Sequence, residues 1–311
     1  MSDLFDAATL SLLLDVVDAG SITSGAERAN MTVSAASQRI TKLEKSIGQP
    51  VLVRLPRGVQ VTEAGAVLVE RARLFRREMR AARGDLEALR GLERGTVRLG
   101  SFPTVSASLL SDALKSFHHS QPSITVQVRS ALRPRLVEML HSSEVELALM
   151  WSYAWTEAAE QSLSLVPVAT DRTVLLVAAD SEIEDNVTVR SLRSAQWIIR
   201  NDRHPASEVL FRACAAARFE PRVVYEAHDY QEIEAMVAAG VGIAMVPELA
   251  IAHHRPDVRM VRFAGRDEVP SRSITIASLA RRQYTPAMYA ISRAIHDAAR
   301  SIAQRGQVQR V

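Results

Sequence analysis

The sequence contains few of the residues that build redox or membrane-embedded sites. Its 311 residues include one cysteine, Cys214, which excludes an intrachain disulfide and fits a reducing compartment. Cys214 lies in an alanine-rich helical pattern, which favours a packed thiol over a nucleophile or a metal ligand. The longest apolar run, residues 236–252, is interrupted by two glycines, a proline and a glutamate, so it does not predict a membrane span. Residues 1–3 lack the basic and apolar segments of a signal peptide, and we therefore expect a cytoplasmic protein.

Motifs for nucleotide or metal chemistry are also missing. No Gly-x-Gly-x-x-Gly follows a predicted strand, and no phosphate-binding loop motif occurs. Gly240-Val241-Gly242 is more typical of a helix end than of a nucleotide-binding loop. The histidine pairs at 118–119 and 253–254 are adjacent, and adjacent residues do not face each other on a helix. No cysteine or carboxylate lies near them at metal-ligand spacing. The sequence therefore predicts no cofactor, no metal site and no enzymatic activity.

The composition predicts a globular protein of about two domains. Hydrophobic residues make up 47% and charged residues 23% of the chain, enough apolar material for a substantial core. The positive charge is unevenly distributed along the sequence. Residues 28–77 contain ten Lys/Arg and three Glu, a net charge of +7, whereas the whole chain has a net charge of only +3. Such a local excess of positive charge indicates a nucleic-acid-binding segment.

Residues 21–47 predict two short helices joined by a tight turn. Thr23 is the expected cap of the first helix, Thr32 the cap of the second, and Gly48 ends the second. The second helix has one apolar face and one face of hydroxyl, amide and cationic side chains. The apolar face comprises Ala36, Ile40, Leu43 and Ile47, and the polar face Ser34, Ser37, Gln38, Thr41, Lys42 and Lys45. Such a helix fits a DNA major groove, although an ordinary amphipathic surface helix shows the same pattern.

The residues after Gly48 favour the DNA-binding interpretation. Residues 51–54 and 59–61 predict two short strands, joined by a Pro56-Arg57-Gly58 turn. The hairpin presents Arg54 and Arg57 beside the two helices. A basic hairpin in this place is a wing, which contacts phosphates or the minor groove.

These segments resemble the N-terminal domain of LysR-type transcriptional regulators. The matching residues are Gly20 to Thr23, Ala26 to Arg28, Thr32, Ala35, Ser37, Ile40, Leu43-Glu44, Gly48, Leu52, Arg54 and Thr62 to Gly65. Two departures concern DNA contacts: Val33-Ser34 replaces the usual Gln-Pro, and Gln38-Arg39 replaces the usual Arg-Gln. The expected DNA-binding residues are Thr23, Thr32, Val33, Ser34, Ser37, Gln38, Thr41, Lys42, Arg54 and Arg57. The resemblance implies a homotetramer, with RNA polymerase as a further partner.

A long helix is expected from Thr62 to about residue 92. Its apolar residues follow alternating spacings of four and three, which is a coiled-coil seam. The expected dimerisation residues are Leu68, Phe75, Met79, Ala82, Leu86 and Leu89, with Ala72 in the same seam. A single helix lying on a domain is the alternative, but the seam is narrower than a globular core face. We therefore expect the helix to pair with a second copy of the chain.

The second half of the chain predicts an α/β domain with parallel sheets. Strands alternate with helices from residue 95 onwards, and a strand at 273–279 returns to the first lobe before a closing helix at 286–303. The predicted strands are 96–100, 124–128, 146–150, 163–169, 173–178, 196–200, 222–226 and 242–246. This arrangement resembles the family's effector-binding domain, which is similar to periplasmic binding proteins. We predict three regions: a winged helix-turn-helix at 1–61, a linker helix at 62–92, and an effector domain at 95–305. Lobe I would comprise 95–162 and 268–305, and lobe II 163–267.

The expected effector contacts lie beyond the carboxyl ends of strands and near helix N-termini, where open α/β sheets bind ligands. They are Ser101, Phe102, Thr104, Arg133, Trp151, Arg200, Asp202, Arg203, Tyr230 and Gln231. Each has a structural alternative: Thr104 as a simple helix cap, Arg203 as a partner of Asp202, and the aromatic residues as core. The positive side chains and helix N-termini favour a small organic ligand with an anionic or strongly hydrogen-bonding group.

The sequence as a whole thus predicts a regulator that binds double-stranded DNA and responds to a small effector. The competing class is a small-molecule binding module, which the second domain alone would suggest but which has no need of a basic N-terminal domain. An architectural DNA-binding protein is a third possibility, although it has no use for a two-lobed cleft.

Overall fold

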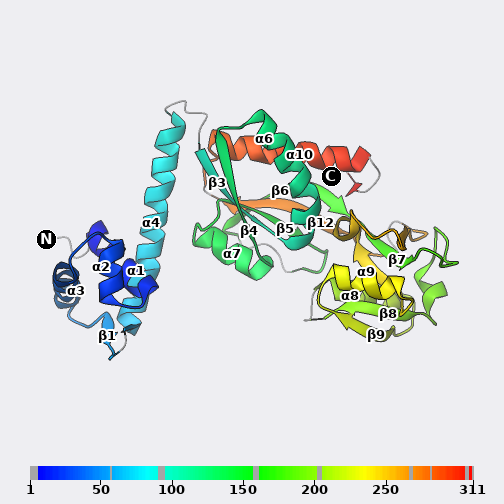
Figure 1. Ribbon diagram of the computed structural model, residues 1–311, viewed down its shortest axis with the longest axis horizontal. Helices are drawn as coiled ribbons and strands as arrows, with labels where there is room; N and C mark the ends of the chain where they lie inside the picture. Colours follow the sequence, from blue (N-terminus) through cyan, green and yellow to red (C-terminus); the bar gives the residue numbers. More distant parts are fainter. Residues whose placement is uncertain are drawn as a thin grey trace. The chain divides into compact units, whose positions relative to one another are not determined.

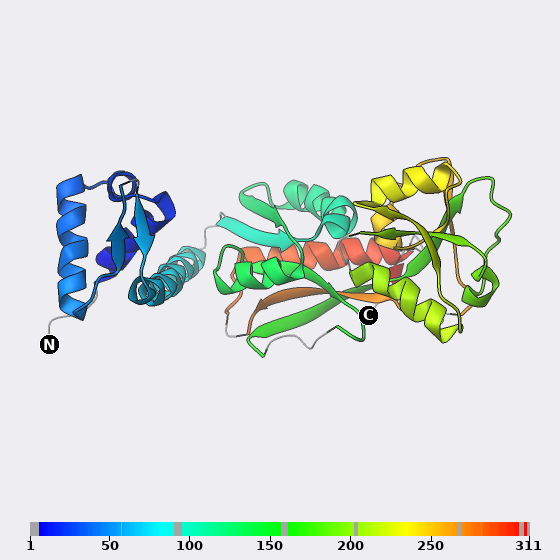
Figure 2. The ribbon, with the colours of Figure 1, turned by 90° about the horizontal axis from the view of Figure 1, so that it is seen from below.

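The computed structural model describes residues 6–56, 58–89, 95–156, 161–201, 205–265, 269–280, 282–304 and 308–309. The chain forms two compact units, divided between residues 92 and 93. We call them the N-terminal unit and the C-terminal unit and describe each by itself (Figures 1 and 2).

The described residues of the N-terminal unit form three short helices, a two-stranded hairpin and one long helix. Its elements are α1 (Ala7–Ala19), α2 (Ile22–Arg28), α3 (Val33–Ile47), β1 (Leu52–Arg54), β2 (Val59–Val61) and α4 (Glu63–Leu89). β1 and β2 pair antiparallel, which is the hairpin predicted for the wing. The core contains Ala36, Ile40 and Leu43 of α3 with Leu13 and Val16 of α1. α3 therefore buries the apolar face that its sequence predicts.

Local side-chain hydrogen bonds set the ends of these helices. The Thr32 hydroxyl accepts a hydrogen bond from the Ala35 N–H at 3.2 Å, and Gly48 ends α3 with a φ of 74°, so both predicted ends of α3 are confirmed. The predicted cap of the preceding helix is wrong. Ser21 caps α2 by accepting from the Ser24 N–H at 3.1 Å, because it is the residue with extended backbone immediately before the helix. Thr23 lies inside α2 with an exposed side chain.

The first half of α4 packs against the core of the N-terminal unit. Val69 and Ala72 are buried in its core and Leu68 packs against it, so this part of the predicted seam is not free. Arg76 also binds α1, with its Nη2 2.7 Å from the Ser11 carbonyl oxygen and 3.0 Å from Asp15 Oδ1. The seam becomes exposed only at Phe75, beyond the end of the core. Of the other expected seam residues, Met79, Ala82 and Leu86 are exposed, and the side chain of Leu89 lies outside those described.

Lobe I of the C-terminal unit is a six-stranded mixed sheet in the order β13-β6-β12-β5-β3-β4. Its strands are β3 (Gly95–Ser101), β4 (Ile124–Ser130), β5 (Leu147–Ser152), β6 (Leu163–Asp171), β12 (Arg272–Leu279) and β13 (Val308–Gln309). α6 (Ser111–Ser120) and α10 (Pro286–Gln304) cover one face of the sheet, and α7 (Arg133–His141) covers the other (Figure 1). The alternating side chains of β5 explain the two layers, because Leu147 and Leu149 pack towards α6 and α10 while Ala148 and Met150 pack towards α7.

Lobe II contains a three-stranded antiparallel sheet, β10-β7-β11, and a parallel pair, β8-β9. Its elements are β7 (Thr173–Ala178), η2 (Val189–Leu192), β8 (Gln196–Arg200), α8 (Pro205–Ala216), β9 (Arg222–Ala227), α9 (Tyr230–Ala238), β10 (Ala244–Pro247), η3 (Glu248–Ile251) and β11 (Val258–Val261). β7 again alternates: Val174 and Leu176 pack towards α9, and Leu175 and Val177 towards α8. The two lobes are joined where β6 continues into β7 and where the chain returns to β12.

The strand pairing corrects two expectations. Only β3, β4 and β5 of the lobe I sheet are parallel, since β12 runs antiparallel to both β5 and β6. The strand expected at 163–169 was grouped with lobe II, but β6 lies in the sheet of lobe I. Its partner β12 begins about a hundred residues later, and this long-range pairing moves the first crossing between the lobes from residue 163 to about residue 172. β11 was not predicted.

The segment after β3 differs from the single helix expected at 105–119. It consists of α5 (Pro103–Val105), a five-residue π-helix η1 (Ser106–Leu110) and then α6. η3 of lobe II contacts both α5 and η1. Short π-helical insertions within α-helices are frequent at functional sites. The first turn of this helical segment therefore forms part of the contact between the lobes.

Candidate DNA-binding surface and effector site

The polar face of α3 is accessible on the N-terminal unit. The side chains of Val33, Ser34, Gln38 and Lys42 are exposed, and those of Ser37 and Thr41 are half-buried. Thr32 is exposed as well, although its hydroxyl already accepts the capping hydrogen bond. The opposite face is held in the core, so α3 presents this row outward as one surface. A helix presented in this way has the shape and the hydrogen-bonding groups that fit a major groove.

The wing and α3 are directly connected. Arg54 on β1 donates a hydrogen bond from Nη2 to the Ser37 hydroxyl of α3, at 2.9 Å. Arg54 itself remains exposed, so its guanidinium extends the polar surface of α3 by one positive charge. The sequence predicted separate roles for these two residues, whereas the structure joins them in one contact. Arg57, also predicted here, lies outside the described residues.

Ion pairs neutralise part of the positive charge counted from the sequence. Arg39 binds Asp6 at 3.1 Å, Arg73 binds Asp18 at 3.5 Å, and Arg76 binds Asp15 at 3.0 Å. All three acids lie at or in α1, outside the segment 28–77 for which the charge was counted. These arginines fasten α3 and α4 to α1. The charge next to the exposed face of α3 comes instead from Lys42, Lys45 and Arg54.

In the C-terminal unit a small cavity lies where the two lobes meet. Its lining residues come from both lobes and from the returning strand β12: Phe102, Pro103, Thr104, Leu132, Trp151, Arg200, Tyr230 and Arg272. The guanidinium of Arg200 lies over the Tyr230 ring, 5.3 Å from its centroid. The cavity volume is about 40 Å³, far below the roughly 300–1,000 Å³ of typical organic-ligand sites. An organic ligand therefore enters only if the lobes or the wall side chains move apart.

A buried ion pair lies beside this cavity, at the edge of lobe I that meets lobe II. Arg272, at the start of β12, and Asp171, at the end of β6, are 2.7 Å apart, and both are fully buried. Arg272 also donates from Nη2 to the Thr104 hydroxyl of lobe I at 2.8 Å, and Asp171 accepts from the Leu249 N–H of lobe II at 3.0 Å. These four groups form a continuous polar chain from one lobe to the other, which we call the interlobe relay. An occupant of the cavity would contact two of its members, Thr104 and Arg272.

Burial perturbs the carboxyl groups at the relay. It raises the pKa of Asp171, while the Arg272 guanidinium opposes this shift. The neighbouring Glu248 begins η3 and is almost completely buried, and among the described residues its Oε2 has no hydrogen-bond partner. Burial first, and then the negative charge of Asp171, raise the pKa of Glu248 from 4.5 to about 7, against the opposing charges of Arg262 and Arg172. Glu248 therefore changes its protonation state near neutral pH, next to the contact between the lobes.

A row of aromatic rings extends from the cavity towards lobe II. Phe102 and Trp151 meet edge to face at 6.4 Å, and Trp151 meets Tyr153 in the same way at 5.6 Å. Tyr153 stacks on Trp155 at 4.7 Å with nearly parallel rings. Arg212, on α8 of lobe II, lies over the Trp155 ring at 4.4 Å. These aromatic residues thus pack in the core and, through Phe102 and Trp151, also form part of the cavity wall.

Five of the ten expected effector residues line the cavity: Phe102, Thr104, Trp151, Arg200 and Tyr230. The expectation that Ser101 contacts the effector is corrected. Its side chain is fully buried, and its hydroxyl accepts a hydrogen bond from Ser106 at 2.8 Å. Arg133 donates to the Trp151 carbonyl oxygen at 3.2 Å behind the wall, and Gln231 is exposed on α9; neither lines the cavity. Asp202 and Arg203 lie outside the described residues.

Sequence reasoning missed Arg272 and Asp171. Each stands at the end of an apolar strand, in Pro270-Ser271-Arg272-Ser273-Ile274 and in Val168-Ala169-Thr170-Asp171. A charge that enters a buried strand needs a partner, because an unpaired buried charge is costly. Two such charges of opposite sign at the ends of predicted strands were the available signal.

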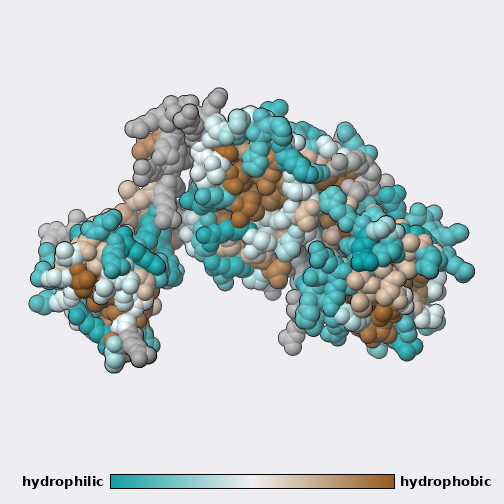
Figure 3. Space-filling model, in the orientation of Figure 1, coloured by the Kyte–Doolittle hydropathy of each residue, from teal (hydrophilic) through white to brown (hydrophobic). Residues whose placement is uncertain are grey.

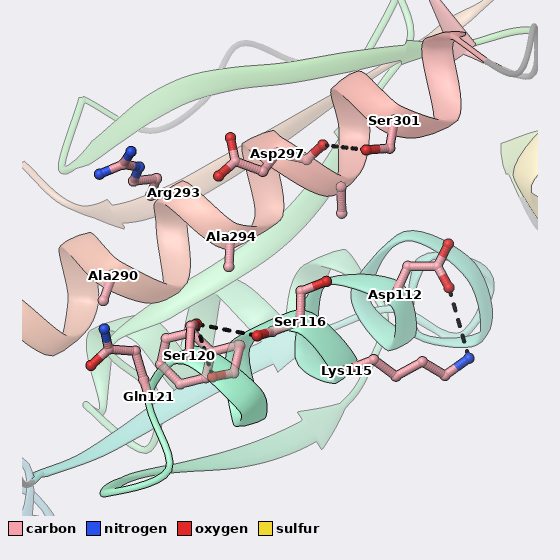
Figure 4. A pocket seen from close by; sticks show the side chains of 12 residues that line it. Asp112, Lys115, Ser116, Ser120, Gln121, Ala290, Arg293, Ala294, Asp297 and Ser301 are labelled. Atoms are coloured by element: carbon pink, nitrogen blue, oxygen red, sulfur yellow. Dashed lines mark hydrogen bonds and ion pairs between the residues drawn. The ribbon is translucent and has the colours of Figure 1, made fainter.

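A wider groove lies on lobe I between α6 and α10, with a volume of about 660 Å³. Figure 4 shows Ala290 and Ala294 pointing towards α6, while Arg293 points away from it. The polar side chains of the groove largely bind their own helices: Ser120 donates to the Ser116 carbonyl and Ser301 to the Asp297 carbonyl. Hydrophobic residues also gather in a patch on the face of lobe I seen in Figure 3. Among the described residues that line this groove, no set of polar groups converges, so the interlobe cavity is the better ligand site.

The described residues contain neither a metal-binding cluster nor a membrane-spanning helix. Within the described part of the chain, no three histidine, cysteine or acidic side chains lie close enough together to hold a metal ion. None of the described helices combines the length and the apolar character needed to cross a membrane.

Comparison with known proteins decides the family. Residues 8–66 match the bacterial regulatory helix-turn-helix proteins of the lysR family, and residues 90–300 match the LysR substrate binding domain. The chain belongs to the LysR family of transcriptional regulators. The LysR-type winged helix-turn-helix joined to an α/β effector-binding domain is thus confirmed as the fold class.

Individual relatives agree with this assignment over most of their length. ClcR of Pseudomonas putida is 27% identical over 269 residues, which cover 82% of this chain and 87% of ClcR. The hydrogen peroxide-inducible genes activator of Haemophilus influenzae is 26% identical over 81% of this chain and 83% of its own. Among solved structures, a variant of full-length OxyR from Pseudomonas aeruginosa superposes with a TM-score of 0.72, at 18% identity, covering 99% of this chain and 98% of that one. CbnR in complex with its target DNA gives 0.66 at 19% identity, covering 94% and 100%.

Membership of the LysR family establishes the general function. The protein is a DNA-binding transcriptional regulator with an effector-binding domain, and its family is one of regulators rather than enzymes. The helix-turn-helix match therefore decides against a small-molecule binding module without a regulatory role, since such a module would lack this domain.

Proposed function

We propose that this LysR-family regulator is controlled by a small effector bound in the interlobe cavity. The observation that supports the proposal is the interlobe relay, which an occupant of the cavity would contact from one side. Binding can regulate only if the ligand prefers one arrangement of the lobes over another. A ligand that inserts between Thr104 and Arg272, or bonds to both, changes the contact that joins lobe I to lobe II.

The lining of the cavity favours an effector with a flat apolar part and an anionic or strongly hydrogen-bonding group. Arg272 and Arg200 supply positive charge, and Phe102, Trp151 and Tyr230 supply aromatic walls. The charge of Arg272 is offset by Asp171, so the ligand would share the guanidinium with this carboxylate rather than meet an isolated cation.

A thermal-shift screen of organic acids tests the location of this site. An acid that stabilises the parent should stabilise Thr104→Val less, because the variant loses the hydroxyl that accepts a hydrogen bond from Arg272 at the cavity wall. Ser101→Ala is the matched control, since it removes a neighbouring hydroxyl that is buried outside the cavity lining. Equal ligand-induced shifts in the parent and in Thr104→Val would place the ligand elsewhere.

We further propose that the exposed row of α3 contacts bases and that Arg54 contacts phosphate. The expected set stays as predicted: Thr32, Val33, Ser34, Ser37, Gln38, Thr41, Lys42 and Arg54 on the described surface, together with Thr23 of α2 and with Arg57, which lies outside the described residues. Support comes from the exposure of the row, from the Arg54–Ser37 hydrogen bond, and from the similarity of the fold to CbnR, whose structure contains its target DNA. Such a protein acts where the chromosome is, and we propose a cytoplasmic location.

The exposed half of α4 supports dimerisation. Phe75 is 41%, Met79 57% and Leu86 61% exposed, and Ala82 lies on the same face. An isolated helix gains nothing by presenting a stripe of apolar residues to water, and such stripes mark interaction surfaces. We propose that two copies pair along this stripe, which brings two α3 helices to one duplex. We also propose a homotetramer and a contact with RNA polymerase, and both of these proposals rest on membership of the LysR family.

A peroxide response, suggested by the names of several relatives, is not favoured. The single cysteine, Cys214, is fully buried in α8, and burial raises the pKa of its thiol to about 11. The thiolate is the reactive form of cysteine, so this side chain is a poor target for an oxidant.

A further inference from the structure

Val33 is an unusual residue on the α3 surface. It is the first residue of α3, directly after the Thr32 cap, and its side chain is 45% exposed. Its exposed neighbours on the same surface are hydroxyl, amide or cationic side chains, namely Ser34, Gln38 and Lys42. Val33 is thus the one apolar side chain at the amino end of this otherwise polar row.

Folding of the unit does not explain a valine at this position. Its side chain lies outside the hydrophobic core of the N-terminal unit, which α3 contacts through Ala36, Ile40 and Leu43. A β-branched side chain also loses rotamer freedom in a helix and is a weaker helix former than alanine or glutamine. The exposed methyl groups of Val33 are therefore available for a contact with a partner molecule.

The chemistry of the major groove narrows that contact. Residues in the first turn of a recognition helix contact base edges. Those edges carry hydrogen-bond donors and acceptors, with a single apolar group among the four bases, the C5-methyl of thymine. Valine offers only methyl groups, so a base edge that needs a hydrogen bond would lose one by facing it.

We propose that Val33 contacts a thymine C5-methyl group and thereby specifies a T·A pair in each half-site. This inference rests on the proposed role of α3 as the base-contacting helix. The proposed contact is an apolar one between methyl groups, and it lies next to the hydrogen-bonding contacts proposed for Ser34, Ser37 and Gln38. Replacement of thymine by uracil removes the methyl group and changes nothing else on the base, so the proposal can be tested at one carbon atom.

The experiment begins with a selection of duplexes from a random library by the full-length parent. Each thymine of the enriched motif is then replaced by deoxyuridine, one at a time, and the dissociation constant is measured. At one position per half-site, replacing thymine by deoxyuridine should lower the affinity of the parent for the duplex about three- to tenfold. This is the range expected for one buried methyl group. In Val33→Ala this difference between thymine and uracil should largely disappear, and Val33→Thr, which keeps one methyl, should retain part of it.

Val53→Ala is the matched control. Val53 lies on β1 and is also 45% exposed, so its truncation removes the same apolar group from the same unit but not from α3. The control should keep the thymine–uracil difference of the parent even if its overall affinity changes. Because Val33 is exposed, its variants should fold. Measuring their melting temperatures checks that they do.

Three outcomes overturn the inference and leave DNA binding intact. They are an enriched motif without thymine, equal affinity of the parent for every uracil-substituted duplex, and a Val33→Ala variant that keeps the full thymine–uracil difference. Failure of the parent to enrich any motif would instead contradict the proposed function of α3, and the inference with it.

Discussion

At the residue scale, the contact between the lobes depends on a few buried polar side chains. Burying Asp171 and Arg272 costs solvation energy, and the pair is tolerated because each has further partners: Thr104 for Arg272 and the Leu249 N–H for Asp171. Glu248 is less well satisfied, since one of its oxygens has no hydrogen-bond partner in the part of the chain that the structure describes. A carboxyl group held in this way is more stable in its neutral form.

Glu248 should make the stability of the protein depend on pH. Its folded-state pKa, about 7, lies above its ordinary value of 4.5, so between these values the folded state binds more protons than the unfolded state. Stability should therefore fall as the pH rises through this window. Glu248→Gln, neutral at every pH, should remove this fall and leave the variant more stable than the parent at pH 8, by about 1–2 kcal/mol.

Chemical denaturation of both proteins at pH 5 to 8 measures this difference. Glu220→Gln, which removes a glutamate charge from an exposed position just before β9, is the control for loss of charge. Parallel stability curves for the parent and Glu248→Gln would show that Glu248 does not titrate in this window.

The Arg54–Ser37 hydrogen bond should couple the effects of two DNA-contact variants. Arg54→Ala should weaken binding to all duplexes by about 1–2 kcal/mol, as expected for loss of a charge-assisted phosphate contact. Ser37→Ala should change the preferred bases and also release the guanidinium, so the double variant should lose less than the sum of the two single losses. A double-mutant cycle on selected and scrambled duplexes measures the coupling, about 0.5–1 kcal/mol. Strict additivity would mean that the two side chains act independently on DNA.

At the element scale, the parts of the fold determined by neighbouring residues were predictable. The ends of α3 follow from Thr32 and Gly48, and its buried face from spacings of three and four residues. The effector site was harder to predict because distant segments form it. β6 and β12 meet across about a hundred residues, and this pairing alone brings Asp171 to Arg272. Ser101 was misplaced because it is the last residue of β3, where its buried hydroxyl accepts a hydrogen bond from Ser106 of the following helical segment.

The exposed stripe of α4 gives the clearest prediction at this scale. Met79→Glu places a charge at the centre of the proposed dimer seam, opposite the same charge of the second copy, and should shift the protein towards monomers. Because Met79 is 57% exposed in the single chain, the variant should keep its fold. Sedimentation at micromolar concentration measures the change. Gln60→Glu, which adds the same charge at an exposed residue of β2, is the control, and equal association of parent and Met79→Glu would exclude α4 as the principal interface.

At the scale of the whole molecule, the charge distribution predicts how DNA binding depends on salt. Arg39, Arg73 and Arg76 are bound by acids of the N-terminal unit, which leaves chiefly the cations beside α3 for phosphates. If a dimer neutralises about six phosphates, log K should fall against log salt with a slope of about −5. Binding titrations between about 50 and 200 mM salt give the slope directly. A flat response would contradict a phosphate-contacting surface on this unit.

The central claim is that occupancy of the interlobe cavity alters DNA binding through the interlobe relay. The most direct measurement is the affinity of the full-length protein for a selected duplex, titrated with an organic acid that stabilises the parent but not Thr104→Val. A coupling of about 1–3 kcal/mol predicts a 5- to 150-fold change in affinity or a corresponding change in the protected half-sites, absent in Thr104→Val. Unchanged affinity and an unchanged footprint at saturating acid would show that the cavity binds a ligand without controlling the regulator.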